Sequence, residues 1–268
     1  MKRAFITTGI LLFLAALFYA NGHYGLLSMA GLNAKGLAIK EVKGSLVSIQ
    51  QTSAIRIDHA QWTELLRKYV KEDGTVDYKG FLKDKEQLHT YLNILSAHVP
   101  TNDWSVQEQL AYYINLYNAH TVNLILENYP IKSIKDIEGA WTKDIVKIGD
   151  KQISLGGLEH GILRKMNEPR IHFAINCASA SCPDLLNEAF APKELNQQLE
   201  KVTLAFINSD KNAITQEEVA LSHIFKWYKS DFDDGDPVGY INKYSKVKIR
   251  PETKIGYKKY DWSLNEQN

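Results

Sequence analysis

The chain has 268 residues, 44% of them hydrophobic, and its 32 basic and 31 acidic residues leave a net charge of +1. This composition is typical of a globular protein with one large domain or two small ones, and it excludes a disordered or low-complexity chain. The charge balance, together with the lack of zinc-finger spacing, a P-loop or a Rossmann glycine pattern, argues against nucleic acid as a partner.

The amino-terminal segment, residues 1–20, has the pattern of a secretory signal. Lys2 and Arg3 precede an apolar run that extends from Ala4 to Ala20. The run is short for a bilayer span, and Phe18 is bulky where a cleavage site needs a small residue, so a cleaved signal peptide and a retained anchor both stay open. Either way we expect an exported protein of the periplasm or cell envelope, attached to the membrane through this segment if it is retained.

The first half of the chain is predicted to be a linker followed by helices. Residues 21–56 show no sustained periodicity and indicate a connector, so we expect a single domain over residues 57–268. Apolar side chains then recur at helical spacing. The helices expected here cover residues 59–70, 88–95 and 105–128, the last with Ser105 as its N-cap and Glu108 in its first turn.

Strands enter the pattern in the second half. Residues 145–148 and 151–154 flank Gly149-Asp150, which predicts a two-residue hairpin. Further elements follow: helices over residues 155–166, from about 183 and over 193–208, and strands at residues 171–175, 218–221 and 254–260. The sequence therefore predicts an α+β fold in which a helical amino-terminal half packs on a small, mainly antiparallel sheet.

Both cysteines of the chain lie in residues 170–183, a predicted strand that ends in a turn of small residues. A thiol at the end of a strand is accessible, so Cys177 is the candidate nucleophile. Such a thiol needs a base that lowers its pKa from about 8.5. We predict His160, on the short helix upstream, as that base, with Glu159 orienting its ring.

Two further residues of this region are assigned to substrate binding. On a strand, His172 would lie about 16 Å from Cys177 and on the opposite face, where it lines the cleft or holds the sheet edge. Cys182 precedes Pro183, a favoured first residue of a helix, so a helix dipole would lower its thiol pKa and make it a rival nucleophile.

Polar residues on the upstream helices complete the predicted site. Asn115 and Asn118 lie three residues apart and share a helix face. Asn118 is expected to stabilise an oxyanion and Asn115 to contact the substrate, or else both amides bond a buried loop backbone. Arg164, one turn beyond His160, is expected to hold a substrate carboxylate.

Two other arrangements of the cysteines and histidines stay open. In an oxidising compartment Cys177 and Cys182 would pair as a disulfide, and neither would then be a resting nucleophile. His160 and His172 would join them as the ligand types that zinc prefers, but the tight ligand spacing of zinc sites is absent. We therefore predict neither a metal nor a cofactor.

Three motifs in order give the chain a resemblance to the domain of unknown function 547 family. They are Tyr113-Ile-Asn-Leu-Tyr-Asn-Ala119, Leu158-Glu-His-Gly-Ile-Leu-Arg164, and Arg170-Ile-His-Phe-Ala-Ile-Asn-Cys177 with Ser181-Cys-Pro183. With Asp73-Gly-Thr-Val-Asp-Tyr78 and Tyr260-Asp-Trp-Ser-Leu-Asn265, the resemblance covers about residues 57–265. The resemblance implies a domain but no assured activity. It favours Cys177 over Cys182 as the nucleophile, because the cysteine that matches Cys177 is the more constant of the two in the family's pattern. The positions of His160, Arg164, His172 and Asn118 match the family motifs as well.

A looser resemblance is to papain-like cysteine hydrolases, in which a thiol, an imidazole and an amide or carboxylate meet between a helix and a sheet. Because histidine precedes cysteine here, this resemblance implies a permuted arrangement. The function expected is an exported cysteine-dependent hydrolase or acyltransferase that acts on an amide or ester bond of a peptide, a glycan or a small molecule. The alternative is a non-catalytic cell-envelope module that binds a peptide, glycan or protein partner, with a structural disulfide or metal site at the cysteines and histidines.

Overall fold

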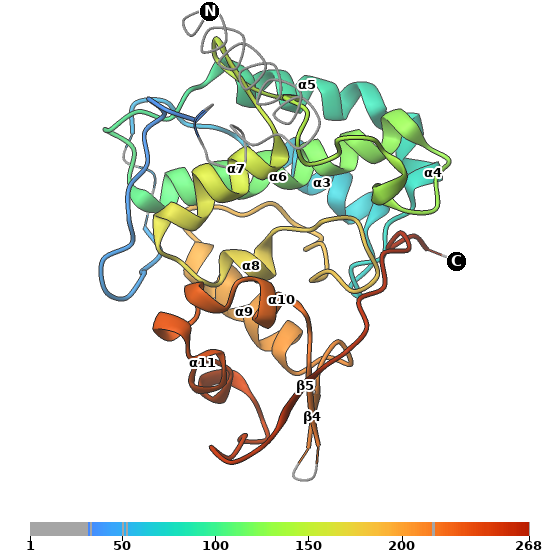
Figure 1. The fold of residues 1–268 in the computed structure, drawn as a ribbon. Helices are drawn as coiled ribbons and strands as arrows, with labels where there is room; N and C mark the ends of the chain where they lie inside the picture. Colours follow the sequence, from blue (N-terminus) through green and yellow to red (C-terminus); the bar gives the residue numbers. More distant parts are fainter. Residues whose placement is uncertain (1–31, 33, 50, 52, 216–217, 268) are drawn as a thin grey trace, which may run out of the picture.

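The computed structural model describes residues 32, 34–49, 51, 53–215 and 218–267 (Figure 1). The segment predicted to be a signal peptide or anchor, residues 1–20, lies outside this part of the chain. No helix within the described part is long and apolar enough to cross a membrane. The fold is mixed α+β with two small, mostly antiparallel sheets, which confirms the predicted class.

The first half of the domain is helical, as predicted. Its α-helices are α3 (Ala60–Tyr69), α4 (Tyr78–Phe81), α5 (Lys85–Ala97) and α6 (Val106–Asn128), and its 3-10 helices are η1 (Leu82–Asp84) and η2 (Ile134–Asp136). Residues 34–49, part of the predicted linker, contribute the buried side chains of Leu37, Val42 and Leu46 to the hydrophobic core.

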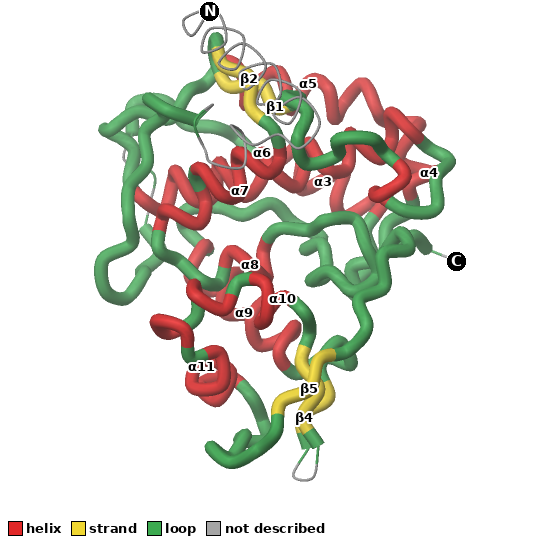
Figure 2. Tube along the Cα trace, viewed as in Figure 1, coloured by secondary structure: helices red, strands yellow, loops and turns green. Residues whose placement is uncertain are grey.

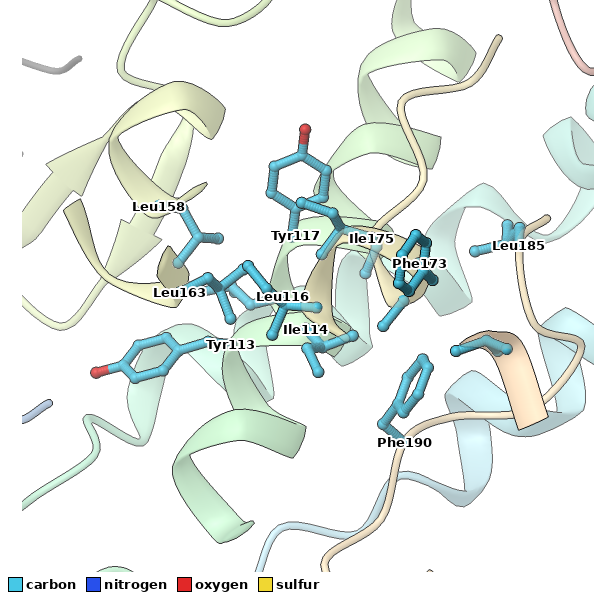
Figure 3. Close-up of a cluster of buried hydrophobic side chains, with 14 of the residues drawn as sticks. Tyr113, Ile114, Leu116, Tyr117, Leu158, Leu163, Phe173, Ile175, Leu185 and Phe190 are labelled. Carbon is cyan, nitrogen blue, oxygen red and sulfur yellow. The ribbon is translucent and has the colours of Figure 1, made fainter. Parts of the chain in front are cut away.

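Helix α6 is the centre of the fold. Nearly all of its side chains are buried, because α5 packs on one side of it and α7 (Leu155–Gly161) on another. Figure 3 shows Leu116 and Tyr117 of this helix among apolar side chains from later segments, including Leu158 and Phe173. A helix buried all round needs well-satisfied ends, and α6 begins with a complete capping box between Ser105 and Glu108.

Replacing Ser105 by alanine is expected to lower the free energy of unfolding by about 1 kcal/mol, the usual value of an N-cap. The Ser105 hydroxyl accepts a hydrogen bond from the backbone N–H of Glu108 at 3.2 Å and donates one to its carboxylate at 2.7 Å. Thr90→Ala is the control, because that exposed hydroxyl only bonds the carbonyl of Glu86 within α5. Urea unfolding of both variants measures the difference, and equal losses would contradict the capping role.

Strands occupy two separate places (Figure 2). The predicted hairpin is confirmed as β1 (Val146–Ile148) and β2 (Lys151–Ile153), joined by a turn in which Gly149 has a φ of 62°. It packs against α5 and α6. The second sheet has β3 (Ala213–Ile214) antiparallel to β4 (Val219–Leu221), which pairs in parallel with β5 (Ile255–Tyr257), so the late strands are confirmed too.

The predicted strand at residues 171–175 is wrong. These residues form α8 (Ile171–Ala174), a single buried helical turn that packs against α9 (Leu195–Ile207). A short apolar run is compatible with a buried strand or a buried helix, and periodicity alone does not separate the two. The predicted helix over residues 155–166 is present but breaks at Ile162, after which η3 (Leu163–Met166) continues.

The helix predicted to begin at about residue 183 is wrong, because residues 183–194 form no helix. This segment runs across the domain as an irregular chain whose backbone is bonded by side chains instead of by helical neighbours. Asn176 donates to the carbonyl of Pro183 at 2.7 Å, and the amide of Asn115 bonds both the N–H and the carbonyl of Phe190. Cys182 therefore does not lie at the start of a helix.

The last part of the chain begins beside α8 and α9 in Figure 1, extends below them and then returns past them. Its helices are η4 (Lys229–Asp231), η5 (Asp233–Gly235), α10 (Ile224–Trp227) and α11 (Pro237–Tyr244). After β5 the chain crosses back to the first half, where Ser179 bridges to Leu264 and Val76 bridges to Glu266. This return brings the carboxyl-terminal residues beside the loop that carries both cysteines.

Candidate functional site

A cavity of about 380 Å³ lies where α7, α8 and the carboxyl-terminal segment meet. Five of the eight predicted site residues line it: Glu159, His160, His172, Cys177 and Cys182. Aromatic side chains form most of the remaining wall, namely Tyr117, Trp141, Trp227, Tyr228, Tyr260 and Trp262. Asn115, Asn118 and Arg164 do not line it.

Cys177 lies on a tight loop that follows α8. Asn176 holds this loop, because its side chain accepts a hydrogen bond from the N–H of Ala178 at 2.8 Å. Ala178 adopts a left-handed backbone with a φ of 56°, an unfavourable conformation for a residue with a Cβ atom. The loop directs the half-buried Cys177 into the cavity.

Hydrogen-bonding groups surround the Cys177 thiol. The hydroxyls of Ser179 and Tyr260 lie 3.2 Å and 3.4 Å from its sulfur, and the two oxygens are 3.3 Å apart. Burial acts to raise the pKa of Cys177, but hydrogen bonds from Cys182 and the two hydroxyls outweigh it, so this pKa is lowered. The groups that lower this pKa are hydrogen-bond donors, whereas the sequence predicts an imidazole base beside Cys177.

The contacts of His160 favour a role other than the base that the sequence predicts. Arg164 is a donor only, and its Nη1 lies 3.0 Å from Nδ1 of His160, so Nδ1 accepts and the neutral ring carries its hydrogen on Nε2. Burial is the main cause of a lowered His160 pKa, which favours this neutral form. The ring therefore offers a donor toward the cavity instead of a base. The hydrogen bonds of the described residues include none between His160 and Cys177.

Glu159 is the acidic group of the cavity wall. Its carboxyl group is buried, with the residue 5% exposed, and Oε1 has no hydrogen-bond partner among the described residues. The other oxygen receives a hydrogen bond from the hydroxyl of Tyr117 at 3.4 Å. A buried carboxyl oxygen without a partner is costly in a structural role, so this group is available to a ligand or a proton.

Arg164 and His172 meet at Asp231, a residue that the sequence did not suggest. Arg164 donates from Nε and Nη2 to the two carboxylate oxygens at 2.6 Å and 2.7 Å, and His172 Nε2 lies 2.8 Å from Oδ2. Burial acts to raise the Asp231 pKa, but the bonds from Arg164 and His172 hold it well below its usual range. The guanidinium predicted to hold a substrate carboxylate is therefore paired with a carboxylate of the chain itself.

His172 enters the same cavity as Cys177 because residues 171–174 are helical. A separation of about 16 Å and an opposite face would require a strand here, and these residues form a helical turn instead. Its ring stacks on Tyr228 with centroids 4.2 Å apart, and Asp231 holds its Nε2. These contacts fix the ring in the cavity wall.

Asn115 and Asn118 bond backbone groups, the alternative that the sequence left open. Asn118 donates to the carbonyl of Ala174 at 2.9 Å and accepts from the N–H of Asn176 at 2.9 Å, so both ends of its amide are occupied. It braces the loop that carries Cys177 and does not reach the cavity. The oxyanion role predicted for Asn118 thus lacks a free amide.

The described residues show neither a disulfide nor a group of metal-binding side chains at the cysteines and histidines. Both cysteines are free thiols. Across the part of the chain that the structure describes, no group of three or more His, Cys, Asp or Glu side chains is placed to hold a metal ion.

The residues that sequence reasoning missed come from the carboxyl-terminal third. Tyr260 and Trp262 lie in the closing motif that the family resemblance includes, so a signal was present in the chain. Asp231, in the run Ser230-Asp-Phe-Asp-Asp234, has no feature that separates it from its acidic neighbours. Only the fold shows that it is the carboxylate that Arg164 and His172 share.

Comparison with known proteins gives one match. Residues 101–207 match the model of a family described as "Protein of unknown function, DUF547". No curated protein and no solved structure matches the chain, so the resemblance to papain-like hydrolases stays a prediction. The match includes α6 and both cysteines and ends before Asp231 and Tyr260. The chain therefore contains a DUF547 family domain at residues 101–207, as the three motifs predict.

Proposed function

We propose that this protein is an exported cysteine-dependent hydrolase or acyltransferase that acts on an amide or ester bond. The observation that carries the proposal is the environment of Cys177: a thiol with a lowered pKa faces a cavity that also contains an unpartnered carboxyl oxygen and an imidazole donor. Nucleophile, base and oxyanion donor are the three groups that acyl transfer requires. Export rests on residues 1–20, which the structure does not describe.

The first half-reaction forms a thioester. The sulfur of Cys177 attacks the carbonyl carbon, a C–S bond forms, and the carbonyl electron pair moves onto oxygen. Glu159 takes the thiol proton through a water molecule and returns it to the leaving amine or alcohol as the C–N or C–O bond breaks. His160 Nε2–H and the hydroxyl of Tyr260 donate to the oxyanion.

The second half-reaction releases the acyl group. Water, or an amine or alcohol in a transferase, attacks the thioester while Glu159 accepts its proton. The C–S bond then breaks, and Glu159 returns the proton to the departing sulfur, which restores the Cys177 thiol and the Glu159 carboxylate. The aromatic walls suit an apolar acyl group or a peptide or sugar ring that stacks on them. No lysine or arginine of the described chain lines this cavity, which favours an uncharged acyl portion over an anionic one.

Cys177→Ala is expected to abolish turnover of activated esters, with a loss of about a thousandfold or more, because the remaining thiol of the cavity, Cys182, has a strongly raised pKa and is a poor nucleophile at neutral pH. The measurement is release of nitrophenol from nitrophenyl esters of different acyl groups, with intact mass spectrometry to detect the acylated chain. Full turnover by Cys177→Ala would overturn the mechanism.

A second pair of variants tests how the thiol is activated. Tyr260→Phe removes a hydroxyl donor from Cys177 and is expected to slow its alkylation by iodoacetamide at mildly acidic pH by several-fold. Tyr257→Phe is the matched control, since this half-exposed tyrosine lies on β5 outside the cavity. An unreactive Cys177 in the wild-type protein, with a ligand still bound, would favour the non-catalytic binding module instead.

A further inference from the structure

The two thiols of the cavity form a close pair. The backbone N–H of Cys177 donates to the sulfur of Cys182 at 2.8 Å. The N–H of Cys182 in turn donates to the carbonyl of Ser179 at 3.0 Å, so a turn folds the chain back on itself. With ordinary bond lengths and a tetrahedral angle at the Cβ atom of Cys182, the 2.8 Å contact places the two Cα atoms at most about 7 Å apart, at the upper limit for a disulfide.

We propose that Cys177 and Cys182 form a dithiol pair that undergoes exchange with a disulfide bond of a partner molecule, Cys177 attacking first and Cys182 resolving. Both thiols line the cavity, but Cys177 is half-buried while Cys182 is only 4% exposed. An incoming disulfide therefore reaches Cys177 first. Cys182 is positioned behind it to attack the sulfur that has reacted.

The two thiols also differ in acidity in the direction that this order needs. The pKa of Cys177 is lowered by the hydrogen bonds it receives, which outweigh its burial. Burial is the main cause of a strongly raised Cys182 pKa, and the neighbouring Cys177 raises it further. Attack requires a thiolate, so at neutral pH the half-buried thiol of Cys177 is the better nucleophile of the two.

The exchange balances without any further reactant. Cys177 thiolate attacks one sulfur of a disulfide R–S–S–R, a new S–S bond forms, and one R–S⁻ leaves. Cys182 then gives up its proton and attacks the Cys177 sulfur, the mixed S–S bond breaks, and the second R–S⁻ leaves. The two departing thiolates take up the two protons, so the partner disulfide is reduced by two electrons and the Cys177–Cys182 pair is oxidised by two.

This inference shares Cys177 with the proposed hydrolase but does not depend on it. Acyl transfer needs the carboxyl group of Glu159 and the donor on His160, whereas exchange needs only the two sulfurs and access to the cavity. A consequence links them: the oxidised pair has no free thiol, so it cannot form an acyl-enzyme until a thiol reduces it.

The test incubates the reduced full-length protein with glutathione disulfide at neutral pH, stops the reaction with acid, and blocks remaining thiols with N-ethylmaleimide. Intact and peptide mass spectrometry then show where each sulfur has gone. We expect the wild-type chain to lose two hydrogen atoms and take up no maleimide, and an early sample to show glutathione on Cys177. Cys182→Ser is expected to keep the glutathione adduct on Cys177, and Cys177→Ser to react at least about tenfold more slowly.

Three results would overturn the inference: a wild-type chain that keeps two free thiols, one that stops at the mixed disulfide, or early glutathione on Cys182. The wild-type time course decides these without any substitution, so a poorly folded variant cannot obscure them. Ester turnover by the reduced protein is measured in parallel. Ester turnover without any reaction with glutathione disulfide would contradict the dithiol exchange and leave the proposed hydrolase in place. Disulfide exchange without ester turnover would contradict the proposed function and leave the dithiol exchange in place.

Discussion

Acidification from about pH 8 to about pH 5 is expected to lower the free energy of unfolding by about 4 kcal/mol, because two histidines are buried in the neutral form. His59 and His120 are 9% and 7% exposed, and burial lowers the pKa of each to about 4. His59 Nδ1 keeps one partner, the hydroxyl of Tyr91 at 2.7 Å, while Nε2 of His120 has none among the described residues.

Stability falls on acidification because the unfolded state binds protons at a higher pH than the folded state does. In the unfolded chain these imidazoles titrate near pH 6.5, well above their folded pKa of about 4, so the unfolded state takes up protons first as the pH falls. Stability is therefore complete above about pH 6.5, declines between about pH 6.5 and about pH 4, and loses nothing more from these groups below that. At about pH 5 the loss is about 2 kcal/mol for each histidine.

Urea unfolding of the wild-type chain and of His120→Leu at both pH values measures this dependence. The leucine removes one titrating group, so the pH effect is expected to fall by about half. Thr121→Val is the matched control, because this neighbouring buried hydroxyl also lacks a described partner but carries no titratable proton in this range. If His120→Leu and the wild type lose equal stability on acidification, buried neutral His120 is not the cause.

The elements that the sequence predicts well are those whose signals are local. Helix α6 has a capping box and a long apolar pattern, and the β1–β2 hairpin has Gly149-Asp150 between two alternating runs, so both are found where expected. The two errors, residues 171–175 and the segment after Pro183, lie where side chains from distant segments decide the backbone. Asn115 and Asn118, on α6, bond Phe190 and Asn176 and thereby hold those segments in place.

The same distinction applies to the candidate site. Cys177, His160 and Glu159 are chemically conspicuous residues in short motifs, and the structure brings all three to one cavity. Their roles depend on partners far away in the chain, which spacing does not reveal. Arg164, only four residues from His160, determines the tautomer of that ring, while Asp231, 67 residues from Arg164, explains why Arg164 is unavailable to a substrate.

Asp231→Asn is expected to cost about 3 kcal/mol of unfolding free energy, near the lower end for breaking a buried ion pair, because Arg164 and His172 both lose their shared carboxylate. The Asp231 side chain is 19% exposed and that of His172 only 2%, so water cannot replace the lost bonds fully. Urea unfolding at neutral pH measures the loss. Asp233→Asn is the matched control two residues away, since its pair with Lys243 is largely exposed and should cost at most about 1 kcal/mol.

The stability loss in Asp231→Asn and the loss caused by the buried histidines depend differently on pH. Because its two partners lower the folded pKa of Asp231, the carboxylate contributes its full stability above the unfolded value near about 4 and loses it only as the pH falls further. The deficit of Asp231→Asn should therefore persist unchanged from about pH 8 to about pH 5, while the histidine effect grows across that same interval. Equal small losses in Asp231→Asn and Asp233→Asn would show that the Arg164–Asp231–His172 contacts do not hold α8 and η4 together. A large, pH-independent loss confined to Asp231→Asn would mean that the cavity wall at His172 depends on a carboxylate outside the matched family region.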